Sequence, residues 1–151
     1  MSVKTLEQKR ALYAWDVINK LKQKENFKSD RILSLFRKLP SMIMHNGLIT
    51  TTAFLKSKSI SKGTLKEEGA VLYALEYYMH HRLEKKEIPE KLESDKFEKS
   101  KVESTHKYYS QELLNMDFSR YRLETAEALR IAQWLKRIAE GEIEDEGKGS
   151  D

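Results

Sequence analysis

Histidine and acidic side chains are the residues best suited to catalysis, and their spacing forms no recognisable active site. The chain has four histidines, and the only adjacent pair is His80 and His81. Neighbouring residues of a helix point about 100° apart, so this pair is poorly placed to share a metal ion. The carboxylates fall in charged runs typical of solvated helix faces, and the sequence lacks metalloprotease, phosphate-loop and nucleophile-elbow motifs. We therefore expect no enzyme, no metal and no cofactor.

Basic side chains form a more informative pattern. Arg130 and Arg137 are seven residues apart, so a helix would place them along one face, with Lys136 beside them. Such a ridge can follow a phosphate backbone, although a solvated face paired with Glu127 and Glu140 is the alternative. The candidate nucleic-acid-binding residues are Arg10, Arg37, Lys38, Lys56, Lys58, Lys62, Arg130, Lys136 and Arg137.

Arg10 is the candidate with the strongest competing interpretation. It projects from the middle of an otherwise apolar helix face. A local ion pair with Glu7, or a side chain that extends its charged end to solvent, would explain it without any ligand.

Charge is distributed unevenly along the chain. Residues 1–66 contain 14 Lys and Arg against 4 Asp and Glu, whereas residues 67–151 contain 14 against 20. A chain of this kind can present one surface to a polyanion and another to a protein neighbour. Folding that interleaves the two halves would instead cancel the difference.

Length and composition fit one helical domain. The chain has 151 residues, of which 34% are charged, with only 6 Gly and 2 Pro. It has no cysteine, no apolar run long enough to cross a membrane and no signal-peptide core at its N-terminus. We therefore expect a cytoplasmic protein without disulfides or a membrane anchor.

Apolar spacing predicts an all-α fold, a compact bundle of about six to seven helices. Residues 5–8 and 64–67 each match a capping box, Asp30 can cap a second helix, and Pro40 suits the first turn of a third that ends at Gly47. The predicted helices span residues 6–24, 30–38, 40–46, 48–58, 65–83, 102–115 and 119–140. The predicted domain covers residues 1–140, with a charged linker at 84–104, followed by a disordered acidic tail at 141–151.

Several sequence blocks, taken in order, resemble one known family. These are residues 8–11, 39–43, 46–48, 53–55 with Lys58, Asp117, 121–122, 125–129, and 134–137 with Ala139. Together they are similar to the small all-helical subunit of the Cmr effector complex, the type III-B CRISPR RNA-guided machine. Two features depart from the family pattern: the charged segment Glu84 to Ser104 is longer, and Ile138 stands where an aromatic residue is common.

The resemblance implies a non-catalytic subunit of an antiviral ribonucleoprotein. Copies would stack along the backbone of the complex, beside other Cmr subunits, and contact CRISPR RNA and target RNA through phosphates. Cleavage would belong to other subunits. Three alternatives remain open: a helical adaptor that binds only protein, a small subunit of a type III-A or type I complex, and a DNA-binding regulator.

Overall fold

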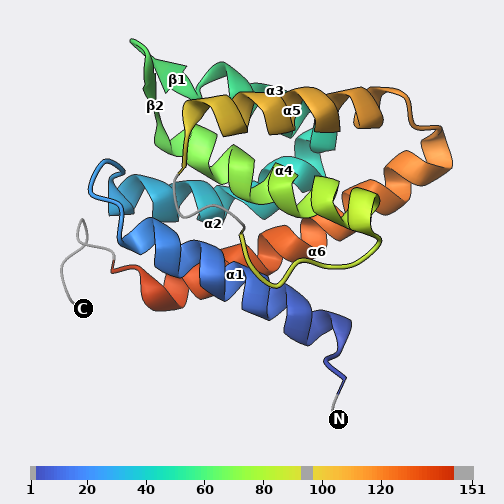
Figure 1. Cartoon of the computed structure of the whole chain (residues 1–151), viewed down its shortest axis with the longest axis horizontal. Coiled ribbons are helices and arrows are strands. Elements are labelled where there is room, and N and C mark those ends of the chain that lie inside the picture. The colour runs from blue at the N-terminus through green and yellow to red at the C-terminus, as the bar shows by residue number, and fades with distance from the viewer. Residues whose placement is uncertain (1–2, 93–96, 145–151) are drawn as a thin grey trace.

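The all-α expectation is confirmed. The computed structural model describes residues 3–92 and 97–144, and these residues form six α-helices and one short hairpin (Figure 1). The helices are α1 (Leu6–Lys22), α2 (Ser29–Asn46), α3 (Leu48–Ser57), α4 (Glu67–Lys85), α5 (Lys99–Leu114) and α6 (Phe118–Glu142). The hairpin strands are β1 (Ile60–Ser61) and β2 (Thr64–Leu65).

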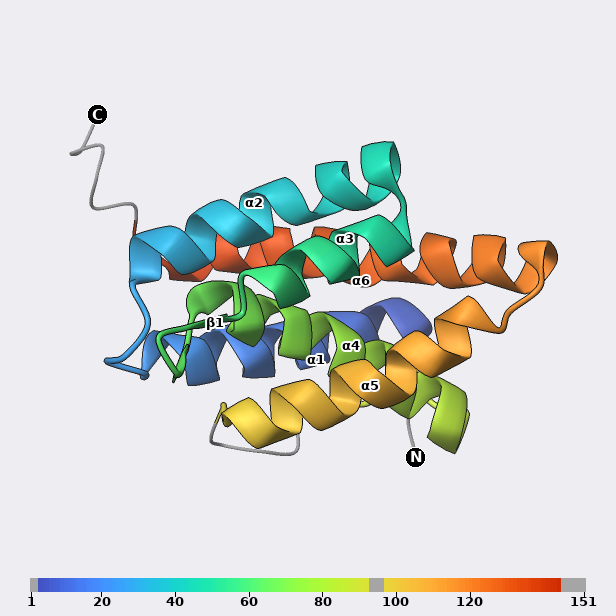
Figure 2. The ribbon, with the colours of Figure 1, turned by 90° about the horizontal axis from the view of Figure 1, so that it is seen from above.

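Helix α4 lies at the centre of the bundle. Nearly every residue of its first three turns is buried, including Tyr73 and Tyr78. Helix α5 covers one side of α4, while α1, α2 and α6 pack together on the other (Figures 1 and 2). Tyr73 and Tyr78 are therefore core residues, and Tyr77 packs against the core with part of its surface exposed.

The capping box at the start of α1 is confirmed. The Thr5 hydroxyl accepts a hydrogen bond from the Gln8 amide at 3.1 Å, and the Gln8 side chain accepts one from the Thr5 amide at 2.8 Å. This reciprocal pair satisfies two backbone donors that the helix itself cannot pair.

Two predicted helices are in fact one, because α2 continues through Pro40. Proline removes one backbone donor and costs roughly 3 kcal/mol in a helix interior. Phe36, Leu39, Pro40 and Ile43 are all buried on the same side of α2, so continued burial of this face offsets the cost. Asp30 is consequently not a cap; it lies in the first turn, and Gly47 ends the helix as expected.

The second predicted capping box is wrong. Its residues Thr64 and Leu65 pair with Ser61 and Ile60 in an antiparallel hairpin, and α4 begins two residues later without a side-chain cap. The two turn residues, Lys62 and Gly63, have φ of 52° and 77°. Two successive positive φ angles match the right-handed twist of a two-residue hairpin.

The segment between α4 and α5 is anchored to the core despite its charge. Ile88, Leu92 and Phe97 are buried. The Leu92 amide donates to the Asp16 carboxylate at 2.8 Å, and the Lys20 ammonium donates to the Leu92 carbonyl at 2.6 Å. Helix α5 begins at Lys99, inside the predicted linker 84–104.

The last helix runs past the predicted domain boundary at residue 140. Helix α6 ends at Glu142, and the side chain of Ile143 is buried. The remaining residues of the predicted tail, 145–151, lie outside the described part of the chain. No described helix is both long and apolar enough to cross a membrane.

Candidate nucleic-acid interface

Helix α6 presents the predicted basic ridge on its outer face. Its buried side carries Ala128, Ile131 and Leu135, whereas Arg130 and Arg137 are exposed. The Arg137 guanidinium lies 4.9 Å from the centre of the Trp134 ring, a cation–π contact that orients it along the helix surface. Lys136 is half-buried at the flank of the ridge, and the Arg130 Nη1 atom lies 3.5 Å from Glu127.

Helix α2 brings further predicted cations to the end of this ridge. The Arg37 Nε donates to the Glu140 carboxylate at 3.2 Å, and both side chains are about two-fifths exposed. This contact places Arg37 beside the last turns of α6, and Lys38 is exposed next to it. We call Arg37, Lys38, Arg130, Lys136 and Arg137 the α2–α6 cluster.

The other predicted lysines lie around the end of α3. Lys58 caps the C-terminus of α3 and is exposed, and Lys62 is exposed in the hairpin turn. Lys56 is half-buried, and its positive charge opposes the burial that raises the pKa of Glu76. We call these three residues the α3–hairpin cluster. Helix α2 packs against both α3 and α6, so it is the element that connects the two clusters (Figure 2).

Arg10 belongs to neither cluster, but it takes part in an ion pair with Glu127, the carboxylate that also pairs with Arg130. Its Nε and Nη2 atoms donate to the two oxygens of Glu127, each at 2.9 Å, and both side chains are largely buried. The hydrogen bond with Glu127 is the main reason that the pKa of Arg10 is raised. The partner is 117 residues away, so the suggested local pair with Glu7 is not formed.

Two buried glutamates of α6 make contacts that were not predicted from the sequence, where Glu127 was considered only as a partner of the basic ridge. Glu124 accepts from Arg82 and Tyr109, and Glu127 accepts from Arg10 and Tyr78 and, at 3.5 Å, from Arg130. Burial alone would raise the pKa of Glu127, but Arg10 and Tyr78 outweigh burial and lower it. The interpretation of the carboxylates as solvated faces is therefore wrong here.

A sequence signal for this pair did exist. Glu124 and Glu127 are three residues apart and adjoin the apolar positions of α6, so both carboxylates had to face a neighbouring helix. The hydrogen bonds of the two glutamates connect α6 to α1, α4 and α5. Both carboxylates are therefore held in buried ion pairs and tyrosine hydrogen bonds.

Glu76 and His106 form a further buried pair between α4 and α5. The His106 Nδ1 atom lies 3.0 Å from the Glu76 carboxylate, which is fully buried. Burial raises the pKa of Glu76, and His106 opposes this shift. Among the described residues no group of three or more His, Asp or Glu side chains is arranged to hold a metal ion.

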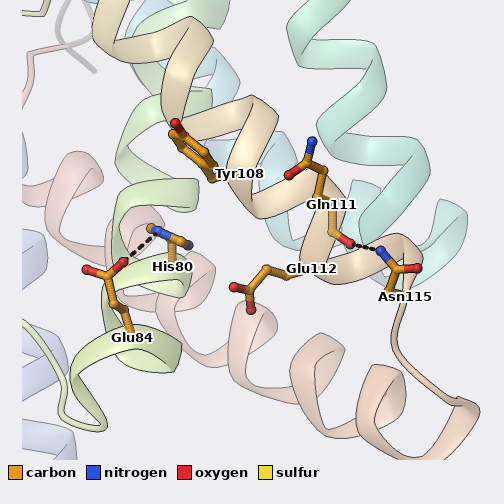
Figure 3. A pocket seen from close by; sticks show the side chains of 6 residues that line it. All are labelled: His80, Glu84, Tyr108, Gln111, Glu112 and Asn115. Atoms are coloured by element: carbon orange, nitrogen blue, oxygen red, sulfur yellow. Dashed lines mark hydrogen bonds and ion pairs between the residues drawn. The ribbon is translucent and has the colours of Figure 1, made fainter.

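A polar groove between α4 and α5 is unsuited to phosphate (Figure 3). Its lining includes the carboxylates of Glu84 and Glu112, which would repel an anion. The Glu84 carboxylate lies 3.4 Å from the Nε2 atom of His80, and the ring of His80 lies nearly parallel to that of Tyr108. The basic clusters on α2, α3 and α6 are thus the better candidates for contact with nucleic acid.

Comparison with protein-family models gives one match that covers most of the chain. Residues 6–142 match the model described as CRISPR-associated protein (Cas_Cmr5). The matched segment begins at the first residue of α1 and ends at the last residue of α6, so it includes all six helices. The all-helical fold and the resemblance to a Cmr small subunit agree with this match. The chain therefore belongs to the Cas_Cmr5 family of CRISPR-associated proteins.

Proposed function

We propose that this Cmr subunit is a non-catalytic, RNA-contacting component of its effector complex. It acts in the cytoplasm in antiviral defence, where several copies stack beside other Cmr subunits. The α2–α6 and α3–hairpin clusters face the guide RNA and target RNA and contact phosphates without reading sequence. Base pairing supplies specificity, and the protein recognises backbone and A-form shape.

The observation that carries this proposal is the exposure of cations on a rigid helix. Arg130 and Arg137 keep exposed guanidinium groups along one face of α6, and Arg37 is fixed beside the end of the same helix. Rigid cations at regular spacing release counterions from a phosphate backbone with little loss of side-chain freedom. Exposed lysines that merely improve solubility would need no such alignment.

The rival function is a helical adaptor whose basic clusters face acidic proteins. It is favoured by the exposed apolar side chains that the structure leaves on several helices, among them Trp15, Phe54 and Leu123. Exposed large apolar side chains favour protein contacts where they gather into one patch. Both functions are compatible with membership of a multi-subunit complex, so they must be separated by a binding measurement.

Salt dependence of RNA binding by the full chain separates the two functions. We expect weak binding of a labelled RNA duplex by one free copy, on the order of 10⁻⁴ to 10⁻⁶ M at physiological salt. The logarithm of the binding constant should fall with the logarithm of salt concentration by about 0.9 for each phosphate contacted. Binding of polyglutamate with no measurable binding of RNA would instead favour the adaptor.

A further inference from the structure

A basic pocket lies where α1, α4 and α6 meet, and it adjoins the α2–α6 cluster because its residue Glu127 also pairs with Arg130. Its volume is about 450 Å³, and five of its lining side chains are basic: Lys9, Arg10, Arg82, Lys86 and Arg120. Only Arg10 was a candidate from the sequence, because the others are spread over three helices and 111 residues of chain. Folding brings them together.

Charge within the pocket is unbalanced. Two carboxylates line it, those of Glu87 and Glu127, and Glu124 lies behind it on the guanidinium of Arg82. Five cations therefore meet three carboxylates. This excess of positive charge, carried mainly by the exposed Lys86 and Arg120, attracts anions to the pocket.

Two of the cations are fixed in position but retain free donors. The Arg10 pair with Glu127 uses Nε and Nη2, and Tyr78 is a further hydrogen-bond partner of this guanidinium, which carries five N–H protons in all. The Arg82 pair with Glu124 uses both terminal nitrogens, which leaves its Nε proton. Burial disfavours the charged form of Arg82, yet the hydrogen bond and charge of Glu124 outweigh burial and raise its pKa. Both arginines are thus pre-organised to donate to an incoming anion.

The other three cations have no carboxylate partner among residues 3–92 and 97–144. Lys9, Lys86 and Arg120 form no ion pair within that part of the chain. Lys86 follows α4 in a left-handed conformation, with φ of 57°, and its amide donates back to the Arg82 carbonyl. Lys9 and Arg120 lie in the first turns of α1 and α6.

Helix direction adds to the positive potential. Arg10 pairs with Glu127 and Lys22 pairs with Glu142, so α1 and α6 run parallel. Their N-termini point to the same end of the molecule, on the right in Figure 1. The positive ends of both helix dipoles therefore lie on the side of the pocket and favour an anion there, whereas α4 ends at Lys85 beside the pocket and its negative end partly opposes them.

We propose that this pocket binds a phosphate group of an RNA strand. The inference rests on the proposed RNA-contacting function and adds a site whose five cations belong to neither cluster, although it adjoins Arg130. Arg10 and Arg82 form the fixed floor, and Lys9, Lys86 and Arg120 close around the phosphate from three helices. Leu6, Leu83 and Ile88 line the same pocket and pack against the adjoining sugar.

The test uses the full chain with three substitutions, Lys9→Gln, Lys86→Gln and Arg120→Gln. Arg10 and Arg82 stay unchanged, because they support the fold. The matched control replaces three exposed lysines of α5, Lys99, Lys101 and Lys107, with glutamine, which changes net charge equally. Urea unfolding and circular dichroism should match the parent for both variants.

Binding of labelled oligouridylate is then measured at several salt concentrations. We expect the pocket variant to lose about 0.7 from the salt slope, the value for one phosphate of a single strand, and the α5 control to keep the parental slope. In parallel, titration with inorganic phosphate should shift the amide resonances of the parent around Lys9, Lys86 and Arg120, and these shifts should vanish in the variant.

Two results would overturn the pocket assignment. One is a pocket variant that keeps the parental slope and phosphate shifts. The other is a pocket that binds polyglutamate but neither RNA nor phosphate, which would assign it to an acidic protein. The proposed function fails separately, when the parent itself shows no salt-dependent RNA binding at all.

Discussion

Replacing Glu127 with glutamine should destabilise the fold by about 3–5 kcal/mol, because a partly buried Arg10 loses its counter-charge. The Glu127 and Arg10 side chains are 9% and 13% exposed, so too little water reaches Arg10 to solvate its charge once the carboxylate is gone. Tyr78 can still donate to the side-chain oxygen of the glutamine, so the substitution removes the negative charge but keeps this hydrogen bond. The free energy of unfolding is measured by urea denaturation with linear extrapolation.

The matched control is Glu140→Gln on the same helix. Its partner Arg37 is 38% exposed, and surface pairs of this kind contribute about 0–1 kcal/mol. Equal losses of stability for the two variants would contradict the structural role of Glu127. A double variant, Arg10→Met with Glu127→Gln, should recover part of the loss, because no uncompensated charge is then left in the pair.

The Arg10–Glu127 pair also predicts how the free energy of unfolding changes as the pH falls. The pKa of Glu127 is lowered from its ordinary value of 4.5 in the folded state, so its contribution is complete above that value. The contribution is lost as pH falls through the lower folded-state pKa. The difference in unfolding free energy between the parent and Glu127→Gln should therefore be constant at neutral pH and shrink below about pH 4.5.

Charge reversal in the two basic clusters should abolish retention of target RNA by the assembled complex. The variant combines Lys56→Glu, Lys58→Glu, Arg130→Glu and Arg137→Glu. If each side chain contacts one phosphate of a duplex, the salt slope falls by about 3.6 in total. Stacked copies multiply the loss, because avidity depends on every copy binding. Filter binding of labelled target RNA to the reconstituted complex measures the effect.

Reversal of four exposed lysines elsewhere provides the control. Lys91, Lys99, Lys101 and Lys107 lie on α5 and the segment before it, and their replacement by glutamate changes net charge by the same amount. Both variants should keep the helical spectrum and join the complex. Target RNA held equally well by the cluster variant and the parent would show that the clusters are ordinary solvated surface.

Local signals in the sequence predicted most of the helices. The capping box of Thr5 and Gln8 depends only on residues three apart, so the sequence contains all that it requires. The similar pattern beginning at Thr64 failed, because Lys62 and Gly63 form a tight turn that commits Thr64 to a strand. The prediction that a new helix begins at Pro40 failed for a related reason. Burial of one face of α2 outweighed the local preference against proline inside a helix.

The candidate interface was predictable only where its residues belong to one helix. The spacing of Arg130 and Arg137 placed both on the exposed face of α6. Nothing local connects Arg10 with Glu127, which is 117 residues away, so the role of Arg10 required the packing of α1 against α6. The basic pocket was hidden for the same reason, since Lys9, Lys86 and Arg120 converge only in the folded chain.

Ultraviolet crosslinking of the affinity-purified native complex tests the central claim most directly. The complex would be isolated through this chain, irradiated and digested, and the peptides joined to RNA would be identified by mass spectrometry. We predict crosslinked peptides from α2 and α6 of this chain, joined to CRISPR RNA or to target RNA. Recovery of the other Cmr subunits and their RNA, with crosslinks on those subunits but none on this chain, would contradict an RNA-contacting role.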